Sequence, residues 1–172
     1  KSVSLSDEAI DYSTAPIIWG QPGTDSQHAF FQLLHQGTHY VPVDFIGFIN
    51  DPSSNKEHHK FLLSNLIAQA SALMTGRPIN NLAPHKAYQG NKPSNTLLID
   101  ELTPKNFGAM IALYEHKVFI QGSIWNINSY DQWGVELGKE MTKKVLSEKA
   151  MEDPSIDAST HHLQNYIQAH TK

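Results

Sequence analysis

The sequence predicts an α/β fold in which helices flank a mainly parallel sheet. Short apolar segments rich in β-branched and aromatic residues alternate with longer segments whose apolar residues recur every three or four positions. This alternation is typical of parallel sheets, because each helix returns the chain to the start of the next strand. The 172 residues, 40% of them apolar, suffice for one folded domain.

The first expected strand is the run Pro-Ile-Ile-Trp-Gly at 16–20, which proline and glycine bound. A helix over 23–36 follows, and Gly37 is expected to end it. Thr24 and Gln27 fit a capping box at its start, so His28 would lie in the first turn. The positive end of the helix dipole would favour a neutral imidazole there.

The remaining segments follow the same two periodicities. They predict, in order, a strand at 39–49, a helix at 57–75, a loop at 77–95, a strand at 96–102 and helices at 104–124, 132–148 and 159–170. Gly76 is expected to end the second helix. Thr103 and Pro104 are expected to cap and open the third.

Composition excludes several classes of function. The net charge is −4 and the one arginine is Arg77, so a nucleic-acid surface is not expected. No apolar run approaches the roughly 20 residues of a membrane-spanning helix. The chain lacks cysteine, which excludes disulfides and thiolate chemistry. The histidine spacing does not match a zinc site, so no metal is expected.

His28 is the first candidate for chemistry. It would lie at the carboxyl end of strand 16–20, the edge at which open α/β sheets bind ligands. A neutral histidine can exchange a proton near pH 7. The alternative is an exposed polar residue that happens to follow a cap. His35 is expected to be structural, and His116 a hydrogen-bonded core residue of an apolar helix.

The second candidate is the segment 130–140, in which Asp131 is a plausible N-cap. In a regular helix Gln132, Glu136 and Lys139 share one face. Gln132 and Lys139 would lie about 10 Å apart along the axis and could flank a small polar ligand. The alternative is a solvated face that carries a weak Glu–Lys pair.

Five segments, in order, resemble the phosphoglucose isomerase (glucose-6-phosphate isomerase) family. WGQPGTDSQHAFFQLLHQG (19–37) and GSIWNINSYDQWGVELGKE (122–140) are similar to its two C-terminal signature regions. HHKFLLSNLIAQASALMTG, PHKAYQGNKPSN and LYEHKVFIQG are similar to the intervening blocks. Asp25 departs from the family's usual asparagine. The segment 76–84 is shorter than in many relatives, so a peripheral helix is expected to be lost.

The resemblance implies a sugar-isomerase (SIS) type fold, with a parallel sheet flanked by helices. It implies a glycolytic, cytoplasmic enzyme that interconverts glucose 6-phosphate and fructose 6-phosphate with neither metal nor organic cofactor. The family's ring-opening histidine falls on His28, and its glutamine and lysine near the sugar ring fall on Gln132 and Lys139. The histidine acts in the neighbouring subunit's site, which implies a homodimer.

The resemblance also implies that residues 1–172 are the C-terminal SIS domain of a two-SIS-domain enzyme, with C-terminal helices from about residue 132. The family's carboxylate base belongs to an ESNGK-like segment whose last residue aligns with Lys1. The base and the phosphate site would therefore lie upstream, and the isolated chain is expected to be inactive. The alternative is a non-catalytic SIS-type module that binds a sugar phosphate. Retention of His28, Gln132 and Lys139 together argues against it.

Overall fold

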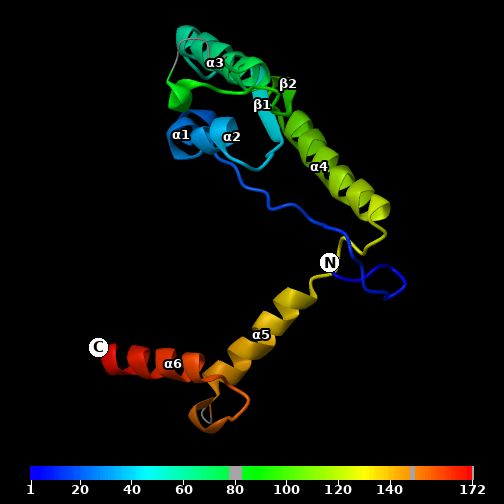
Figure 1. Ribbon diagram of the computed structural model, residues 1–172, viewed down its shortest axis with the longest axis vertical. Coiled ribbons are helices and arrows are strands. Elements are labelled where there is room, and N and C mark those ends of the chain that lie inside the picture. The colour runs from blue at the N-terminus through cyan, green and yellow to red at the C-terminus, as the bar shows by residue number, and fades with distance from the viewer. Residues whose placement is uncertain (78–82, 148–149, 172) are drawn as a thin grey trace. The chain divides into compact units, whose positions relative to one another are not determined.

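The computed structural model describes residues 1–77, 83–147 and 150–171 (Figure 1). Residues 11–121 form one compact unit. A second unit combines Lys1 and residues 3–10 with the chain from residue 122 onward. The assignment of 1–172 to a single SIS domain stays a prediction.

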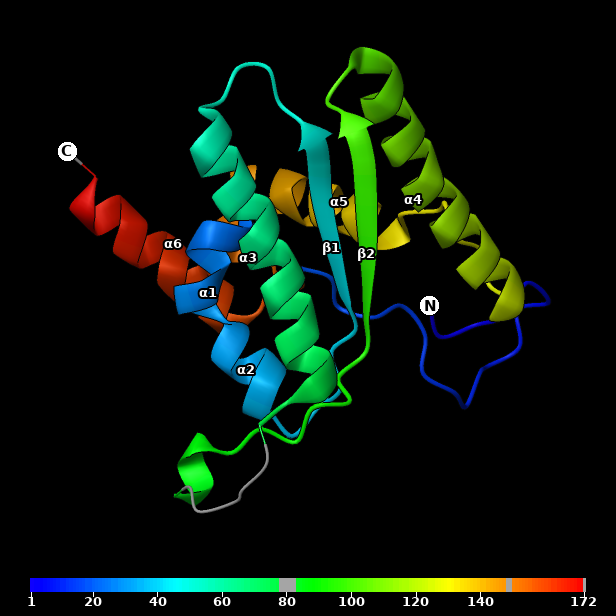
Figure 2. The same ribbon diagram turned by 90° about the horizontal axis from the view of Figure 1, so that it is seen from above.

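The first unit is built on two parallel strands, β1 (Val43–Asn50) and β2 (Ser94–Glu101). Their register pairs Val43 with Ser94 and Asn50 with Glu101. The helix α3 (Lys56–Thr75) follows β1 in the chain, and Figure 2 shows the two strands side by side with α3 running along them. A short 3-10 helix, η1 (Pro84–Lys86), precedes β2. The predicted parallel sheet flanked by helices is confirmed.

Two long helices cover opposite faces of this sheet. On one face a Cβ added at Gly47 would lie 2.9 Å from Leu66 Cδ1, so α3 packs closely against β1 there. On the other face Asp44 accepts hydrogen bonds from Tyr114 (3.2 Å) and Lys117 (2.9 Å) of α4 (Pro104–Ile124). Because successive side chains of a strand point to opposite faces, the two helices sandwich the strands.

The expected helix over 23–36 is two short helices, α1 (Gly23–Ala29) and α2 (Phe31–Gln36). Phe30 separates them with φ −143°, and its ring packs edge-on against Trp19 with centroids 6.0 Å apart. The predicted capping box is also wrong, because Pro22 occupies the N-cap and no side chain caps α1. Phe31 of α2 is buried with Leu34 and Leu73, which form the unit's core.

The expected strand at 16–20 is not formed in the structure. Ile17 is 88% exposed and Ile18 is 78% exposed. A strand needs a neighbour for its backbone groups, and within the described ranges β1 and β2 pair only with each other. The sequence has the β propensity, but this chain offers the segment no paired neighbour.

The predicted helix boundaries around α3 and α4 hold. Gly76 ends α3 with φ +65°, and Thr103 Oγ1 accepts a 3.2 Å hydrogen bond from Asn106 N at the start of α4. His116, expected in the core, is exposed, although its Nδ1 lies 2.7 Å from the Ala112 carbonyl oxygen. The prediction for the shortened segment 76–84 lies largely outside the described residues, as does part of the predicted loop 77–95.

The second unit holds α5 (Trp133–Leu146), a 3-10 helix η2 (Ala150–Glu152) and α6 (Ala158–His170). Asp157 caps α6 by accepting a 3.0 Å hydrogen bond from Thr160 N. Gln164 Nε2 donates to the Val145 carbonyl at 2.9 Å and so ties α6 to α5. Among the described residues, no helix combines the length and apolar character that crossing a membrane requires.

Residues 3–10 form a small turn that we call the N-terminal hook. Val3 and Ala9 make an isolated antiparallel bridge. The Ser4 hydroxyl accepts hydrogen bonds from the Ser6 and Glu8 amides at 3.1 and 3.3 Å. The hook attaches to the segment before α5 through Leu5 N, which donates to the Asn126 carbonyl at 2.8 Å.

Candidate functional site

Gln132 stands at the start of α5. It is the N-cap residue, with φ −140°, and its carbonyl accepts hydrogen bonds from Val135 N (2.8 Å) and Glu136 N (3.2 Å). Its side chain is exposed and makes no capping bond. The helix therefore begins one residue later than predicted, and the Gln132 amide is available to a ligand.

Lys139 lies two turns further along α5. Its ammonium donates to Glu136 Oε1 at 2.8 Å, which confirms that these two side chains share a face. The Lys139 side chain is 60% exposed and that of Glu136 is 45% exposed. An exposed pair of this kind contributes only about 0.3–0.5 kcal/mol, so a ligand anion or hydroxyl could replace Glu136 as the partner of Lys139 at little cost.

Asp131 does not cap α5 as predicted. Its carboxylate instead forms an ion pair with the Lys1 ammonium. The pair joins the first residue to residue 131, so no local sequence pattern reveals it. It brings the start of the chain beside the residue that directly precedes Gln132.

His28 belongs to the other unit, and it lies in the last turn of α1 rather than the first. The helix is shorter than expected, so the argument from the N-terminal dipole does not apply to it. The imidazole is exposed. An exposed ring at the end of a short helix is accessible to a second molecule, whether a ligand or another chain.

His35 behaves as a structural residue, as predicted. Its half-buried ring lies between Phe31 (centroids 6.5 Å apart) and Tyr88 (5.4 Å, edge-on). This packing ties α2 to the described end of the loop before β2. The histidine that the sequence marked for chemistry is thus exposed, and its neighbour in the same segment is held by aromatic contacts.

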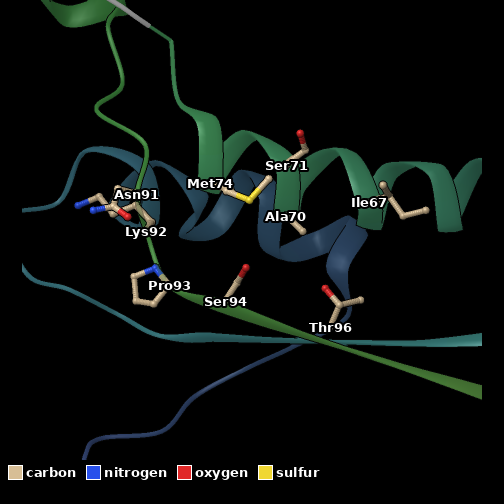
Figure 3. Close-up of a pocket in the computed structure, with 9 residues that line it drawn as sticks. All are labelled: Ile67, Ala70, Ser71, Met74, Asn91, Lys92, Pro93, Ser94 and Thr96. Carbon is tan, nitrogen blue, oxygen red and sulfur yellow. The ribbon is translucent and has the colours of Figure 1, made fainter.

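A groove of about 560 Å³ lies between α3 and the start of β2 (Figure 3). Ser94 and Thr96 of β2 face the helix that carries Ala70 and Met74. The one titratable side chain in its lining is Lys92, whose ammonium lies 4.9 Å from the Tyr40 ring centroid. None of the three predicted site residues lines this groove, and its side chains do not form an acid–base set.

The described part of the chain brings together no group of three or more His, Asp or Glu side chains that could hold a metal ion. The structure places Gln132 at the N-cap of α5 and Lys139 two turns further along, and the Lys1–Asp131 ion pair lies directly before Gln132 in the chain. An amide that donates and accepts hydrogen bonds and an ammonium that donates them suit recognition of a small polar ligand.

A family profile described as phosphoglucose isomerase matches residues 1–164. A glucose-6-phosphate isomerase of Campylobacter jejuni subsp. doylei is 49% identical over 95% of this chain and 33% of its own length. Glucose-6-phosphate isomerase 1 of Chromohalobacter salexigens is 52% identical over 97% of this chain and 30% of its own length.

A solved structure shows the same fold. The crystal structure of a glucose-6-phosphate isomerase from Chlamydia trachomatis superposes with a TM-score of 0.81 at 40% identity, over 99% of this chain and 33% of that one. The chain thus spans about a third of the length of the relatives that it matches. This share agrees with the expectation of a C-terminal portion of a longer enzyme.

Proposed function

The chain belongs to the phosphoglucose isomerase family, and we propose that it forms the ring-opening part of a glucose-6-phosphate isomerase. The observation that carries the proposal is that Lys139 of α5 and Gln132 at its N-cap are both exposed, in a chain that the family profile matches almost throughout. The parent enzyme would interconvert glucose 6-phosphate and fructose 6-phosphate without metal or organic cofactor.

The chemistry begins with a cyclic hemiacetal. To open it, a proton must leave the anomeric hydroxyl and another must reach the ring oxygen, so that the C1–ring oxygen bond breaks. His28 would carry one of these protons, and Lys139 would stabilise the oxygen that develops negative charge. Gln132 would orient the sugar through its amide, which can donate and accept hydrogen bonds.

The isomerisation step needs a carboxylate that moves a proton between C2 and C1 through an enediol. That carboxylate and the phosphate site would lie upstream of Lys1. We propose that His28 acts in the site of a second subunit, so the enzyme is a homodimer. The exposure of His28 supports this, because a residue lent to a neighbour must be accessible. A cytoplasmic location agrees with glycolytic use of the substrate.

The test compares two polypeptides, the 172-residue chain and an upstream-extended chain that includes the ESNGK-like segment and the first SIS domain. Formation of fructose 6-phosphate from glucose 6-phosphate is followed for both. We expect turnover by the extended chain and none above background by the short one. An extended chain that binds glucose 6-phosphate without turnover would instead identify a sugar-phosphate-binding module.

A further inference from the structure

We propose that Asp131 is a positioning residue for the carboxylate base of the isomerisation step. Its ion pair with Lys1 would hold the chain just upstream of residue 1 beside the start of α5. This inference rests on the proposed function, and it concerns a residue that does not itself touch the sugar. The Lys1–Asp131 pair would fix the position of the base relative to Gln132 and Lys139.

The first observation is the environment of the Asp131 carboxylate. Its Oδ1 is fully covered, and the structure gives this oxygen no hydrogen-bond partner within the described ranges besides its ion pair with Lys1. The side chains of Lys1 and Asp131 are only 26% and 22% exposed. Loss of the Lys1 ammonium would leave a covered carboxylate oxygen unpaired, which is energetically costly. The Lys1–Asp131 contact is therefore harder to break than an exposed surface pair.

The second observation is that the chain start is held at another point. Leu5 N donates to the Asn126 carbonyl, so the N-terminal hook and the segment before α5 are joined by the main chain as well. That segment is itself packed, because Ile127 is buried and its amide donates to the Gly122 carbonyl at 2.9 Å. A Cβ added at Gly122 would overlap the Ser129 hydroxyl, so no larger residue fits this turn without movement.

These two attachments limit where the upstream residues can lie. Each residue extends the chain by at most about 3.5 Å, so the backbone three residues before Lys1 lies within roughly 10 Å of the Lys1 backbone, and the Lys1 side chain is held at Asp131. Gln132 follows Asp131 directly. A displacement of about 1 Å in a reacting group can lower the rate about 100-fold. A contact that fixes the chain near the base can therefore affect the rate of proton transfer.

The experiment uses the upstream-extended enzyme and the variant Asp131→Asn, which keeps the side chain's size and removes its charge. We expect kcat to fall about tenfold or more, with KM within about twofold, because the base is displaced while sugar binding is retained. The kinetic isotope effect with substrate deuterated at C2 should rise, since proton transfer becomes more rate-limiting. A residue that merely stabilised the fold would leave the isotope effect unchanged.

Asp157→Asn is the matched control. It removes one carboxylate from the same unit, and asparagine caps a helix about as well as aspartate, so activity should stay at the wild-type level. Lys1→Met removes the cationic partner of the same ion pair, and the same fall in kcat is expected. If Asp131→Asn lowers the folded fraction, the test uses Lys1→Met instead. The Lys1→Met/Asp131→Asn double variant should be no slower than the more damaged single variant, because both changes break the same contact.

The outcomes separate the two proposals. Wild-type extended enzyme without isomerase activity overturns the proposed function. Active wild type together with unchanged kcat and isotope effect in Asp131→Asn overturns only the positioning role. Single-variant losses that multiply in the double variant would also overturn it, because independent effects exclude a shared contact.

Discussion

The two compact units bury their apolar residues in different ways. In residues 11–121, Phe31 and Leu34 of α2 and Leu73 of α3 form a buried cluster against which Val43 and Phe45 of β1 pack. In the other unit, α5 and α6 contain no buried residue, and Trp133 is 74% exposed. The first unit therefore has a hydrophobic core made of its own residues. The second unit buries Ile127, Ala150 and Ile156 in the segments that flank α5 and α6, and polar contacts such as Lys1–Asp131 add to them.

This difference has a consequence for function. α5 carries Lys139 and follows Gln132 directly, and its apolar side chains Val135 and Leu137 are exposed as well. Apolar helix surface of this extent is normally covered by another part of a protein. We expect the remaining two-thirds of the parent enzyme to cover it, and the site on α5 to become complete only then.

The largest effect is expected at the centre of the first unit. Leu73 is fully buried, so Leu73→Ala should lower the free energy of unfolding by about 4 kcal/mol through lost burial and a residual cavity. Met74, its neighbour on α3, is 65% exposed, and Met74→Ala should cost less than about 0.5 kcal/mol. Chemical denaturation measures both. Equal losses would contradict the proposed core.

The end of α3 gives the next effect. Gly76 has φ +65°, and a Cβ there would lie 2.4 Å from Gly90 N and from the Tyr88 carbonyl oxygen. Gly76→Ala should therefore cost about 3 kcal/mol through strain and steric overlap. Gly108 on α4 has open space around its added Cβ, so Gly108→Ala should instead stabilise by about 0.5–1 kcal/mol. Thermal unfolding of the two variants distinguishes these outcomes.

Much of the first unit could be predicted from the sequence, because its signals are local. Helical periodicity gave α3 and α4, and Thr103–Pro104 marked the start of α4 correctly. The strand at 16–20 was wrong because strand formation depends on a neighbour that local propensity does not supply. The break at Phe30 depends on packing against Trp19, which periodicity does not report.

The candidate site was predictable in part for the same reason. The Glu136–Lys139 contact follows from helix geometry, and the structure confirms it. The Lys1–Asp131 pair joins residues far apart in the sequence, so only the folded chain shows it. The roles of His28, Gln132 and Lys139 stay predictions that rest on the resemblance.

A smaller effect is expected from Asp44, which joins the sheet to α4. The hydrogen bond from Asn95, aided by Lys117 and Tyr114, lowers the pKa of its carboxyl below the ordinary value of 3.8. A lowered pKa in the folded state means that its stabilisation is present above pH 3.8 and is lost as the pH falls through the folded-state value.

Asp44→Asn should therefore remove about 1 kcal/mol at neutral pH and make stability less sensitive to acid than in the wild type. Urea denaturation at pH 7 and at a pH below 3.8 measures this. Asp11→Asn, an exposed carboxylate of the same unit, serves as control. Parallel pH curves for wild type and Asp44→Asn would show that the network does not join the sheet to α4.

The smallest effect is expected on the exposed face of α5. Leu137 is 58% exposed, so Leu137→Ala should change the stability of the 172-residue chain by no more than about 0.5 kcal/mol. In the upstream-extended polypeptide the same change should cost about 2 kcal/mol, if the rest of the enzyme covers this face. An equally small loss in both polypeptides would show that α5 stays exposed.

The ring-opening assignment is tested most directly with cyclic and open-chain substrates. In the extended enzyme, His28→Ala and Lys139→Ala are compared with His39→Ala and Lys143→Ala, which remove exposed side chains of the same kinds. We predict that His28→Ala and Lys139→Ala slow turnover of cyclic glucose 6-phosphate by about 10²–10⁴-fold, and turnover of a sugar phosphate too short to close its ring far less. Equal slowing on both substrates would contradict the assignment of ring opening to this part of the enzyme.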